Sequence, residues 1–338
     1  MKAVVLVGGE GTRMRPLTET VPKPLLPLVD RPFLAHVLDR LAGHGVDEAI
    51  LSSPYLEEVF EPFLATRGDR LPRVEWITEP RPLGTAGAIA NALSHLDDTF
   101  FVLNGDILTD LDLTAMAAFH RDRGAVASIA VGPVEDARPY GLVEVDETGR
   151  VAAFREKPTE LVPGTVNMGT YILEPVALRG VPVSRAVSIE TEVFPGLIES
   201  KVPVYGYVSR AYWKDLGTPD KYLQATFDAL DGRIEGLRYV APFLGDGARA
   251  AASAALGRRV VAGADARIGE DARIEDSVLF GAVTVEAGAS VRASIIGHAV
   301  HVGERARIVD CVLAEGAVVP PGTRAEGERV PPFTVLGA

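Results

Sequence analysis

The residues best suited to chemistry stand at the start of the chain. The apolar run Ala3–Val7 leads directly into the glycine-rich segment 8–11. Glycines after a buried strand let backbone N–H groups approach a phosphate closely and form an anion-binding concavity. Two cations follow, Arg13 and Lys23, the second on a loop that neighbouring prolines stiffen. This combination of glycines and cations predicts a site for a phosphorylated ligand.

Two familiar phosphate-binding motifs do not fit this segment. The Rossmann fingerprint has a different glycine spacing and needs a helix directly after the strand. Pro16, Pro22, Pro24 and Pro27 exclude such a helix. The P-loop needs a Lys-Ser or Lys-Thr pair at its end, and the segment has none. A glycine cluster alone is more often a simple turn, so the prediction of a phosphate site depends on the cations beside it.

The elements that must position these residues alternate along the first two-thirds of the chain. Short apolar runs and amphipathic stretches follow one another, which is typical of an α/β sheet. A continuous apolar run such as Ala3–Val7 indicates a strand buried on both faces. Further strands are predicted at Ala49–Leu51, Val74–Ile77 and Phe100–Leu103, a hairpin at Gly141–Val145 and Val151–Phe154, and helices at Phe33–Leu41, Thr85–Leu96 and Pro219–Leu230.

Beyond this region the sequence changes character. Residues 232–259 are rich in Gly and Ala, and we expect the domain boundary there. After it, β-branched or large apolar residues recur about every six positions. A period of six fits neither a helix nor a flat strand. It is the hexapeptide repeat of a parallel β-helix, in which each repeat forms one side of a triangular coil. The inward-pointing residues are expected to be Ile268, Ile274, Phe280, Val285, Val291, Ile296, Val302 and Ile308.

Composition excludes several other classes. The 338 residues are 47% hydrophobic and 24% charged, the ordinary balance of a soluble globular protein. A net charge of −12 argues against a nucleic-acid partner, because that needs clustered cations. The apolar start is too short for a signal-peptide core or a membrane span, so we expect no membrane partner. The single cysteine, Cys311, cannot form an internal disulfide, which is typical of a reducing compartment and predicts a cytoplasmic protein.

Several motifs together resemble the sugar-phosphate nucleotidyltransferase family, also called nucleotide-sugar pyrophosphorylases. The longest is Gly-Gly-Glu-Gly-Thr-Arg-Met-Arg-Pro-Leu-Thr from Gly8, followed by Pro-Lys-Pro from Pro22. Leu-Gly-Thr-Ala-Gly from Leu83 and Ser-Ile-Glu-Thr-Glu-Val-Phe-Pro from Ser188 most resemble the mannose-1-phosphate guanylyltransferase branch. The resemblance covers nearly the whole chain, since the other matching motifs are Leu103–Asp106, Phe154–Pro158, Asn167–Tyr171 and Tyr212–Pro219.

The resemblance implies a fold and a reaction. The fold class is α/β: a Rossmann-like mixed sheet forms a nucleotidyltransferase domain over residues 1–232, a linker covers 233–258, and a left-handed parallel β-helix of hexapeptide repeats covers 259–338. The reaction joins a nucleoside triphosphate, GTP in this branch, to a sugar 1-phosphate, here mannose 1-phosphate, and releases pyrophosphate. Glucose or heptose 1-phosphate with dTTP, UTP or ATP stays an open alternative, and so does a non-catalytic regulatory homologue.

This reaction must overcome the repulsion between two polyanions. Two unit charges about 4 Å apart repel by roughly 4 kcal/mol at an effective dielectric of about 20. Catalysis should therefore rest on positioning and charge neutralisation. The resemblance implies a Mg²⁺ cofactor held by Asp106 and Asp215, and hard Mg²⁺ prefers one or two carboxylates plus substrate oxygens. It also implies that Arg13 and Lys23 contact the triphosphate and the transferring phosphoryl group.

The matching motifs imply the remaining site residues. Lys157 resembles the residue that holds the sugar phosphate, while Glu156, Asn167 and the backbone at Gly141 resemble the groups that read sugar hydroxyls. The nucleotide is expected to contact Leu6, Gly8, Gly9, Gly11, Thr12, Arg13, Glu79, Gly84, Thr85 and Ala86.

Glu79 is the most informative residue for the choice of base. It lies five positions before Gly84, where the pyrimidine-using branches resemble one another in carrying Gln. An amide donates and accepts, as uracil and thymine require, whereas an ionised carboxylate only accepts. Guanine offers two donors, so Glu79 favours guanine, unless it is a solvent-exposed acid after a strand. Arg15, Lys214 and Glu190 are further candidates.

The β-helix leaves other functions to consider. Some fused relatives carry acyltransferase activity there, and His298 and His301 are potential bases. The coils are few, however, and the sequence shows no acyl-CoA signature. We expect instead that the β-helix mediates homo-oligomerisation or ligand regulation at its junction. A purely regulatory protein is disfavoured because the cations and carboxylates named above are all present.

Overall fold

The computed structural model describes residues 1–54, 57–67, 70 and 72–337. Its internal contacts divide the chain into two compact units, each built from two segments. Unit 1 comprises Met1–Gly9 and Leu34–Trp213, and unit 2 comprises Glu10–Phe33 and Lys214–Ala338. The loop that carries Arg13 and Lys23 therefore groups with the β-helix, which differs from the division expected near residue 232.

Unit 1 contains one large sheet and most of the helices. Its strands are β1 (Lys2–Leu6), β4 (Glu48–Ser53), β5 (Arg73–Thr78), β6 (Phe100–Asn104), β7 (Ile107–Thr109), β8 (Ala127–Val134), β9 (Gly141–Val145), β10 (Val151–Glu156), β11 (Gly164–Leu173) and β12 (Val204–Val208). Its helices are α1 (Phe33–Gly43), α2 (Glu61–Arg67), α3 (Gly84–Asn91), α4 (Leu113–Asp122) and α5 (Phe194–Glu199), with the short helices η4 (Glu57–Val59), η5 (Leu93–His95), η6 (Pro175–Leu178) and the π-helical η7 (Ile189–Val193).

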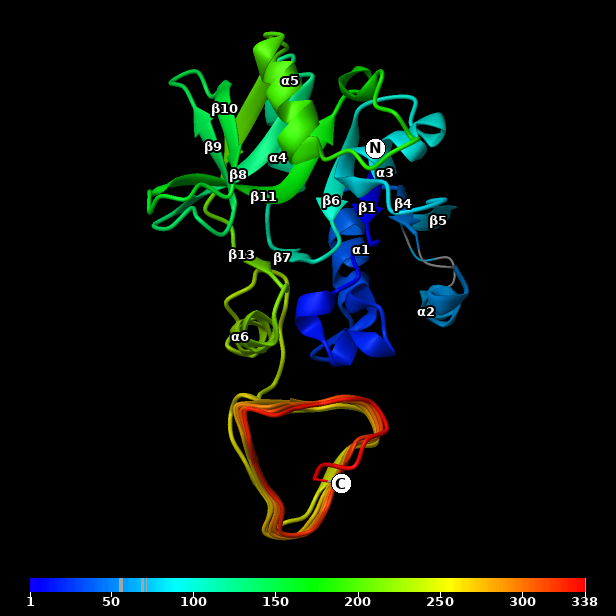
Figure 1. Cartoon of the computed structure of the whole chain (residues 1–338), viewed down its shortest axis with the longest axis vertical. Helices are drawn as coiled ribbons and strands as arrows, with labels where there is room; N and C mark the ends of the chain where they lie inside the picture. Colours follow the sequence, from blue (N-terminus) through cyan, green and yellow to red (C-terminus); the bar gives the residue numbers. More distant parts are fainter. Residues whose placement is uncertain (55–56, 68–69, 71, 338) are drawn as a thin grey trace. The chain divides into compact units, whose positions relative to one another are not determined.

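The sheet of unit 1 is mixed, as the sequence predicts, and it has nine strands (Figure 1). Its main path runs β10-β9-β11-β6-β1-β4-β5, and β8 joins β11 to β12. Strand β1 is parallel to β4 and β6, whereas β11 is antiparallel to β6. Parallel pairing aligns Leu6 with Asn104, so the chain leaves β1 and β6 at the same edge of the sheet. Ligand-binding loops of α/β sheets are found at this edge.

The core of unit 1 explains why the apolar runs form strands. Val4 of β1 and Val102 of β6 are fully buried and belong to the same hydrophobic core cluster. The predicted hairpin is confirmed, because β9 and β10 pair antiparallel. The predicted helix Thr85–Leu96 is shorter than expected: α3 ends at Asn91, and the single turn η5 follows. None of the described helices is both long and apolar enough to cross a membrane.

Unit 2 consists of the cation-bearing loop, one helix and the β-helix. The loop forms η1 (Thr12–Met14), η2 (Leu17–Glu19), η3 (Lys23–Leu25) and the pair β2 (Pro27–Leu28) and β3 (Arg31–Pro32). Strand β13 (Trp213–Asp215) stands at the division between the units, and α6 (Pro219–Leu230) follows. The predicted helix Pro219–Leu230 is confirmed; its Thr218 side chain accepts a hydrogen bond from the Lys221 N–H, and Pro219 occupies its first turn.

Three parallel sheets form the β-helix and give it a triangular cross-section (Figure 1). The first contains β14 (Phe243–Leu244), β17 (Val260–Ala262), β20 (Ser277–Leu279), β23 (Ile295–Ile296), β26 (Val312–Leu313) and β29 (Arg329–Val330). The second contains β15 (Arg249–Ala250), β18 (Arg267–Ile268), β21 (Thr284–Val285), β24 (His301–Val302) and β27 (Val318–Val319). The third contains β16 (Ala255–Leu256), β19 (Arg273–Glu275), β22 (Ser290–Arg292), β25 (Arg307–Val309) and β28 (Arg324–Glu326).

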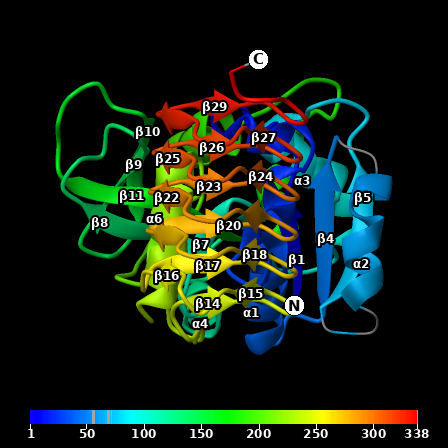
Figure 2. The same ribbon diagram turned by 90° about the horizontal axis from the view of Figure 1, so that it is seen from below.

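The stacked coils confirm the period of the sequence and correct its register (Figure 2). Val261 pairs with Val278 and Val278 with Ile295, so a coil takes 17 residues: two steps of six and one of five. The five-residue step causes the slips in the pattern. It also makes the assignment of Phe280 wrong, because Leu279 fills the interior position. Phe280 points outward, and its ring lies 6.3 Å from that of Tyr222 on α6.

The β-helix also begins earlier than the sequence predicts. Strands β14, β15 and β16 lie within the segment 233–258 that was expected to be a linker. They pair in parallel with β17, β18 and β19 and so form the first coil. The sequence hides this coil because its residues are mostly small: Ala254 and Leu256 pack against the interior only partly buried. Small residues weaken the apolar signal on which the repeat was recognised.

Candidate active site

The glycines after β1 stand where a side chain does not fit. A Cβ atom on Gly8 would lie 2.5 Å from Cδ of Pro54, so this position requires glycine. Gly105, after β6, is equally confined, because its Cβ would lie 2.5 Å from the carbonyl oxygen of Leu6. Gly9 has open space around it. Close backbone packing therefore requires glycine on both loops at this edge of unit 1, and glycines after a strand let backbone N–H groups approach a phosphate.

The second half of the glycine motif lies in unit 2 and is folded by local contacts. Gly11 adopts φ +62°, a left-handed conformation that favours glycine. Its carbonyl oxygen accepts a hydrogen bond of 2.9 Å from the Thr18 hydroxyl. The short helix η1 follows, in which Arg13 and Thr12 are exposed. The turn at Gly11 therefore places Arg13 directly after the glycine loop, in the first helical turn.

Asp215, a predicted metal ligand, is held by charged neighbours within unit 2. Its Oδ2 accepts a hydrogen bond from the Lys221 ammonium. Burial opposes its ionisation, but Lys221, Lys23 and Arg13 together outweigh burial and lower the pKa of Asp215. A Cβ on the neighbouring Gly217 would collide with Asp215 and lie 2.8 Å from Nη2 of Arg13. Glycine at 217 therefore lets the carboxylate and the guanidinium approach each other.

One oxygen of Asp215 tests whether a metal suits this position. Within the described chain its buried Oδ1 has no hydrogen-bond partner. A buried carboxylate oxygen without a donor is costly, and a bound cation would remove that cost. The described residues hold no group of three or more His, Cys, Asp or Glu side chains placed for a metal. The unpartnered carboxylate oxygen is the observation that fits Mg²⁺, an ion that takes one or two protein carboxylates together with substrate or water oxygens.

Asp106, the other predicted carboxylate, lies in unit 1. It occupies the two-residue turn between β6 and β7 and is half-buried. Its position after β6 is the carboxyl edge that the sequence predicts. Next to it, the buried Oδ1 of Asn104 lacks a hydrogen-bond partner among the described residues. Asn104 was not predicted from the sequence; its place at the end of a buried strand was the available signal.

Glu79 is buried, so the expectation of a solvent-exposed acid as the alternative is wrong: the side chain is only 6% exposed. Its Oε2 accepts from the Leu83 N–H at 3.0 Å, and its Oε1 accepts from the Ser52 hydroxyl at 3.2 Å. Burial raises the pKa of Glu79, although these two hydrogen bonds oppose that effect. A carboxylate has room for about four acceptor contacts, so both oxygens can still accept from a base.

A hydrogen-bond network centred on Glu190 joins two predicted parts of the site. The hydroxyls of Thr85 and Ser188 donate to its Oε2 at 2.7 and 2.8 Å. The Tyr171 hydroxyl donates to its Oε1 at 3.2 Å and accepts from Asn167 Nδ2 at 2.7 Å. Thr85 belongs to the nucleotide motif and Asn167 to the sugar motif. Glu190 was only a further candidate in the sequence, because no spacing connects positions so far apart.

The start of α3 is set by a positive backbone angle. Gly84 has φ +70°, and its Cβ would lie 2.7 Å from the carbonyl oxygen of Val187. The Ala86 N–H donates to that same carbonyl oxygen at 2.9 Å. The N–H of Ala86, a residue predicted to contact the nucleotide, is therefore used within the protein.

The predicted sugar-phosphate residues of the β9–β10 hairpin lie together. A Cβ on Gly141 would lie 2.9 Å from Oε2 of Glu156, so the carboxylate rests against this glycine. The Lys157 backbone has φ +45°, and its N–H donates to the carbonyl oxygen of Tyr140 at 3.0 Å. Its side chain is 68% exposed and lies 3.6 Å from Glu156. An exposed cation on a fixed backbone is suited to capture a phosphate.

The other two cationic candidates, Lys214 and Arg15, differ in their surroundings. Lys214 forms an ion pair of 2.8 Å with the buried Asp228 of α6, so its charge serves the packing of unit 2. Arg15 is exposed at the end of η1.

On the β-helix, His298 and His301 are both exposed, and His301 pairs with Glu286 at 3.7 Å. This exposure does not favour the acyltransferase alternative.

Comparisons with known proteins place this site in a wider group. A family model described as nucleotidyl transferase matches residues 2–232, and one described as GMPPB C-terminal domain matches residues 241–337. The mannose-1-phosphate guanylyltransferase of Mycobacterium tuberculosis is 40% identical over 296 residues, 86% of this chain and 82% of that protein. Mannose-1-phosphate guanylyltransferase 1 of Arabidopsis thaliana is 35% identical over 301 residues, 86% of this chain and 83% of that protein.

A solved structure supports the same fold. The crystal structure of HddC from Yersinia pseudotuberculosis superposes with a TM-score of 0.59 at 30% identity and covers 67% of this chain and 97% of that one. A second structure of HddC, complexed with GMP-PN, gives a TM-score of 0.58 with the same identity and coverage.

Proposed function

The chain belongs to the nucleotidyl transferase family, and from this premise we propose that it is a GTP:mannose-1-phosphate guanylyltransferase. The Asp215 geometry carries the proposal: a buried carboxylate oxygen without a donor in the described chain, on a residue whose charge Lys221, Lys23 and Arg13 stabilise. Such a group accepts a hard cation, and the cations around it attract phosphates. The relatives named mannose-1-phosphate guanylyltransferase support the choice of substrates.

The proposed reaction is an in-line displacement at the α-phosphorus of GTP. A phosphate oxygen of mannose 1-phosphate forms a new bond to the α-phosphorus. The bond from the α-phosphorus to the oxygen that bridges to the β-phosphorus breaks, and pyrophosphate leaves with that electron pair. Arg13 and Lys23 hold the triphosphate, and Lys157 holds the sugar phosphate. Arginine suits a bidentate phosphate contact, and lysine supplies a point charge. Glu156, Asn167 and the Gly141 backbone contact sugar hydroxyls.

Asp106 and Asp215 are the proposed ligands of Mg²⁺. When bound, the ion would neutralise charge on the triphosphate oxygens. Binding of the nucleotide is assigned to the edge of unit 1 that carries Leu6, Gly8 and Gly9, to Gly11 and Thr12 of the loop, and to the α3 motif with Gly84 and Thr85. Glu79 is proposed to accept from guanine N1–H and the N2 amino group.

The direct test is a matrix of GTP, dTTP, UTP and ATP against mannose, glucose and heptose 1-phosphates, scored by pyrophosphate release. We expect the highest kcat/KM for GTP with mannose 1-phosphate. A clear preference for another pair would transfer the proposal to that pair. No release with any pair, in the presence of Mg²⁺, would support a regulatory homologue.

We also propose that the β-helix mediates homo-oligomerisation, and a cytoplasmic location stays a prediction. Exposed apolar side chains near the last coil support the first proposal: Phe333 is 71% and Val335 is 43% exposed. Sedimentation of the full chain and of a chain ending at Leu230 would decide, because an identical oligomeric state in both contradicts an assembly role.

A further inference from the structure

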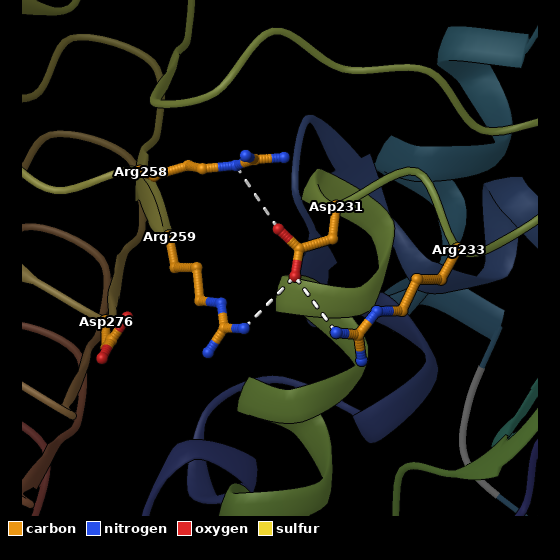
Figure 3. Close-up of a pocket in the computed structure, with 5 residues that line it drawn as sticks. All are labelled: Asp231, Arg233, Arg258, Arg259 and Asp276. Atoms are coloured by element: carbon orange, nitrogen blue, oxygen red, sulfur yellow. Dashed lines mark hydrogen bonds and ion pairs between the residues drawn. The ribbon is translucent and has the colours of Figure 1, made fainter.

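A group of arginines outside the proposed active site lies at the carboxyl end of α6. Figure 3 shows the guanidinium groups of Arg233, Arg258 and Arg259 around the carboxylate of Asp231, the residue that caps this helix. Together with Asp276 they line an open hollow of 520 Å³. We call these five residues the Asp231 cluster. None of them has a role in the proposed reaction.

The cluster is separate from the surroundings of Asp215. Lys221, the partner of Asp215, stands in the first turn of α6, whereas Asp231 follows its last turn. The helix has 12 residues, and at about 1.5 Å per residue its two ends are roughly 18 Å apart. A phosphate bound to the cluster would therefore not be the one bound beside Asp215.

The contacts to Asp231 are longer than tight ion pairs. They measure 3.3 Å from Arg259, 3.5 Å from Arg258 and 3.6 Å from Arg233, whereas charge-assisted hydrogen bonds are usually about 2.7–2.9 Å. A tight pair does form beside them, between Arg233 and Asp228 at 2.8 Å. Asp231 thus marks the point on which three guanidinium groups converge, without using most of their N–H donors.

The β-helix is altered where two of these arginines stand. Leu256 and Val261 are five positions apart, but their partners in the next coil, Ile274 and Val278, are only four apart. Later coils keep the shorter step: Val291 and Ile295 are four positions apart, and so are Ile308 and Val312. The first coil therefore has one extra residue at this corner, and the longer turn carries two adjacent arginines.

The three arginines differ in how far they are exposed. Arg258 is 72% exposed and Arg233 is 54% exposed, so both are accessible to a solute. Arg259 is more confined, and its guanidinium lies 5.7 Å from the centre of the Phe227 ring. Three arginines and two aspartates line the hollow, and Asp228, which pairs with Arg233, also pairs with Lys214, so cations stay in excess here in a chain whose net charge is −12. Local cationic excess attracts small anions.

From this geometry we infer that the Asp231 cluster binds a phosphate group, either free or on a small phosphorylated metabolite. The phosphate oxygens take the N–H donors of Arg258, Arg259 and Arg233 that Asp231 engages only loosely. Guanidinium groups suit phosphate because two parallel N–H donors match two oxygens. The Asp231 carboxylate competes for the same donors, so it limits the affinity. The inference stands independently of the proposed reaction.

Calorimetric titration tests the site with two probes, inorganic phosphate and glucose 6-phosphate, without nucleotide. All proteins carry Lys157→Gln, which removes the proposed phosphate contact of the β9–β10 hairpin. We expect the double variant Arg258→Gln/Arg259→Gln to weaken binding at least tenfold, and Asp231→Asn to strengthen it, because the competing charge is removed. The control is Arg305→Gln, an arginine of the β-helix that is 79% exposed and pairs with Glu304; it should leave binding unchanged.

The outcomes separate a binding site from a structural ion network. Tighter binding of glucose 6-phosphate than of phosphate identifies a metabolite site, and equal binding identifies a phosphate site. Binding that is equally strong in the double variant, or no increase with Asp231→Asn, overturns the inference. Circular dichroism and thermal melting confirm folding; if the double variant does not fold, Asp231→Asn decides alone, since it keeps all three arginines.

Discussion

The Thr85 hydroxyl donates a 2.7 Å hydrogen bond to Oε2 of Glu190, which lies 105 positions further along the chain. Thr85 also accepts a hydrogen bond from the Ile189 N–H at 2.8 Å, so the first turn of α3 is joined to η7 in both directions. Through the Tyr171 hydroxyl the same carboxylate reaches Asn167. One half-buried acid therefore fixes a residue of the nucleotide motif relative to a residue of the sugar motif.

Glu190→Gln should disturb both substrates at once. The carboxylate accepts from three hydroxyls, and an amide would present a donor to one of them, at a cost of about 1–3 kcal/mol. We expect KM to rise for GTP and for mannose 1-phosphate, with kcat/KM lowered roughly tenfold, about 1.4 kcal/mol. The control is Glu192→Gln, an exposed acid of the same segment that pairs with Arg185. A lower kcat with both KM values unchanged would contradict the positioning role.

Asp215→Asn should nearly abolish turnover at saturating Mg²⁺. It removes charge without changing shape, and loss of such a group belongs with electrostatic effects of roughly 10²–10³ in rate. Asp106→Asn should act in the same way. Asp220→Asn, an exposed acid in the first turn of α6, serves as the control. The measurement is steady-state kinetics with a Mg²⁺ titration. Activity of the Asp215 variant within about threefold of the parent would contradict the assignment of Asp215 as a metal ligand.

Glu79→Gln should move base specificity from GTP toward UTP and dTTP. The amide would face a guanine donor with a donor of its own, whereas a pyrimidine edge offers one donor and one acceptor. We expect the ratio of kcat/KM values to change by roughly tenfold or more, about 1.4 kcal/mol. Because Glu79 also binds Ser52 and the Leu83 N–H, unfolding must be measured in parallel. An unchanged ratio means that the carboxylate serves only the protein.

His120 should make the stability of the protein depend on pH. The ring is 2% exposed, with Nδ1 2.8 Å from the Ser128 hydroxyl and Nε2 3.3 Å from Glu174. Burial lowers the pKa of His120 and outweighs the opposing effect of Glu174. Below the usual pKa of about 6.5 the imidazole is protonated in the unfolded chain but not in the folded chain. The free energy of unfolding therefore decreases as the pH is lowered, by up to about 1.4 kcal/mol per pH unit, until the pKa of the folded state is reached.

The matched measurement is urea unfolding between pH 7.5 and pH 5.5, conditions that span about 6.5. His120→Gln cannot take up the proton, so its free energy of unfolding should decline less steeply than that of the parent. His301→Gln, which changes an exposed ring of the β-helix, should keep the parent's slope. Equal slopes for the parent and the His120 variant would refute the assignment.

Phe280→Ala should destabilise unit 2. The ring is 7% exposed and packs outside the β-helix against Tyr222 of α6. Removing a buried phenyl ring costs about 3–5 kcal/mol, and the lower part of that range is expected at a boundary between elements. Phe333→Ala is the natural comparison, because that ring is 71% exposed. Similar thermal stabilities of the two variants would show that the Phe280 contact contributes little.

Much of the fold was readable because its signals are local. Ala3–Val7 predicts β1 from an apolar run, and Pro219–Leu230 predicts α6 from its periodicity and first-turn proline, since both patterns arise within one element. The six-residue period predicts the β-helix in the same way. Local signals failed where the residues are small, as in the first coil within 233–258, and where the period slips by one, as at Phe280.

The chemical groups available to this protein could be read from its sequence: the glycine loop, the cations Arg13 and Lys23, and the carboxylates Asp106 and Asp215. The partners of those groups became visible only in the folded chain. It placed Lys221 on Asp215, buried Glu79 against Ser52, joined Thr85 to Glu190 and gathered the arginines of the Asp231 cluster. The reason is physical: side-chain type and spacing along the chain are local properties, whereas burial and charge pairing depend on distant segments that only folding brings into contact.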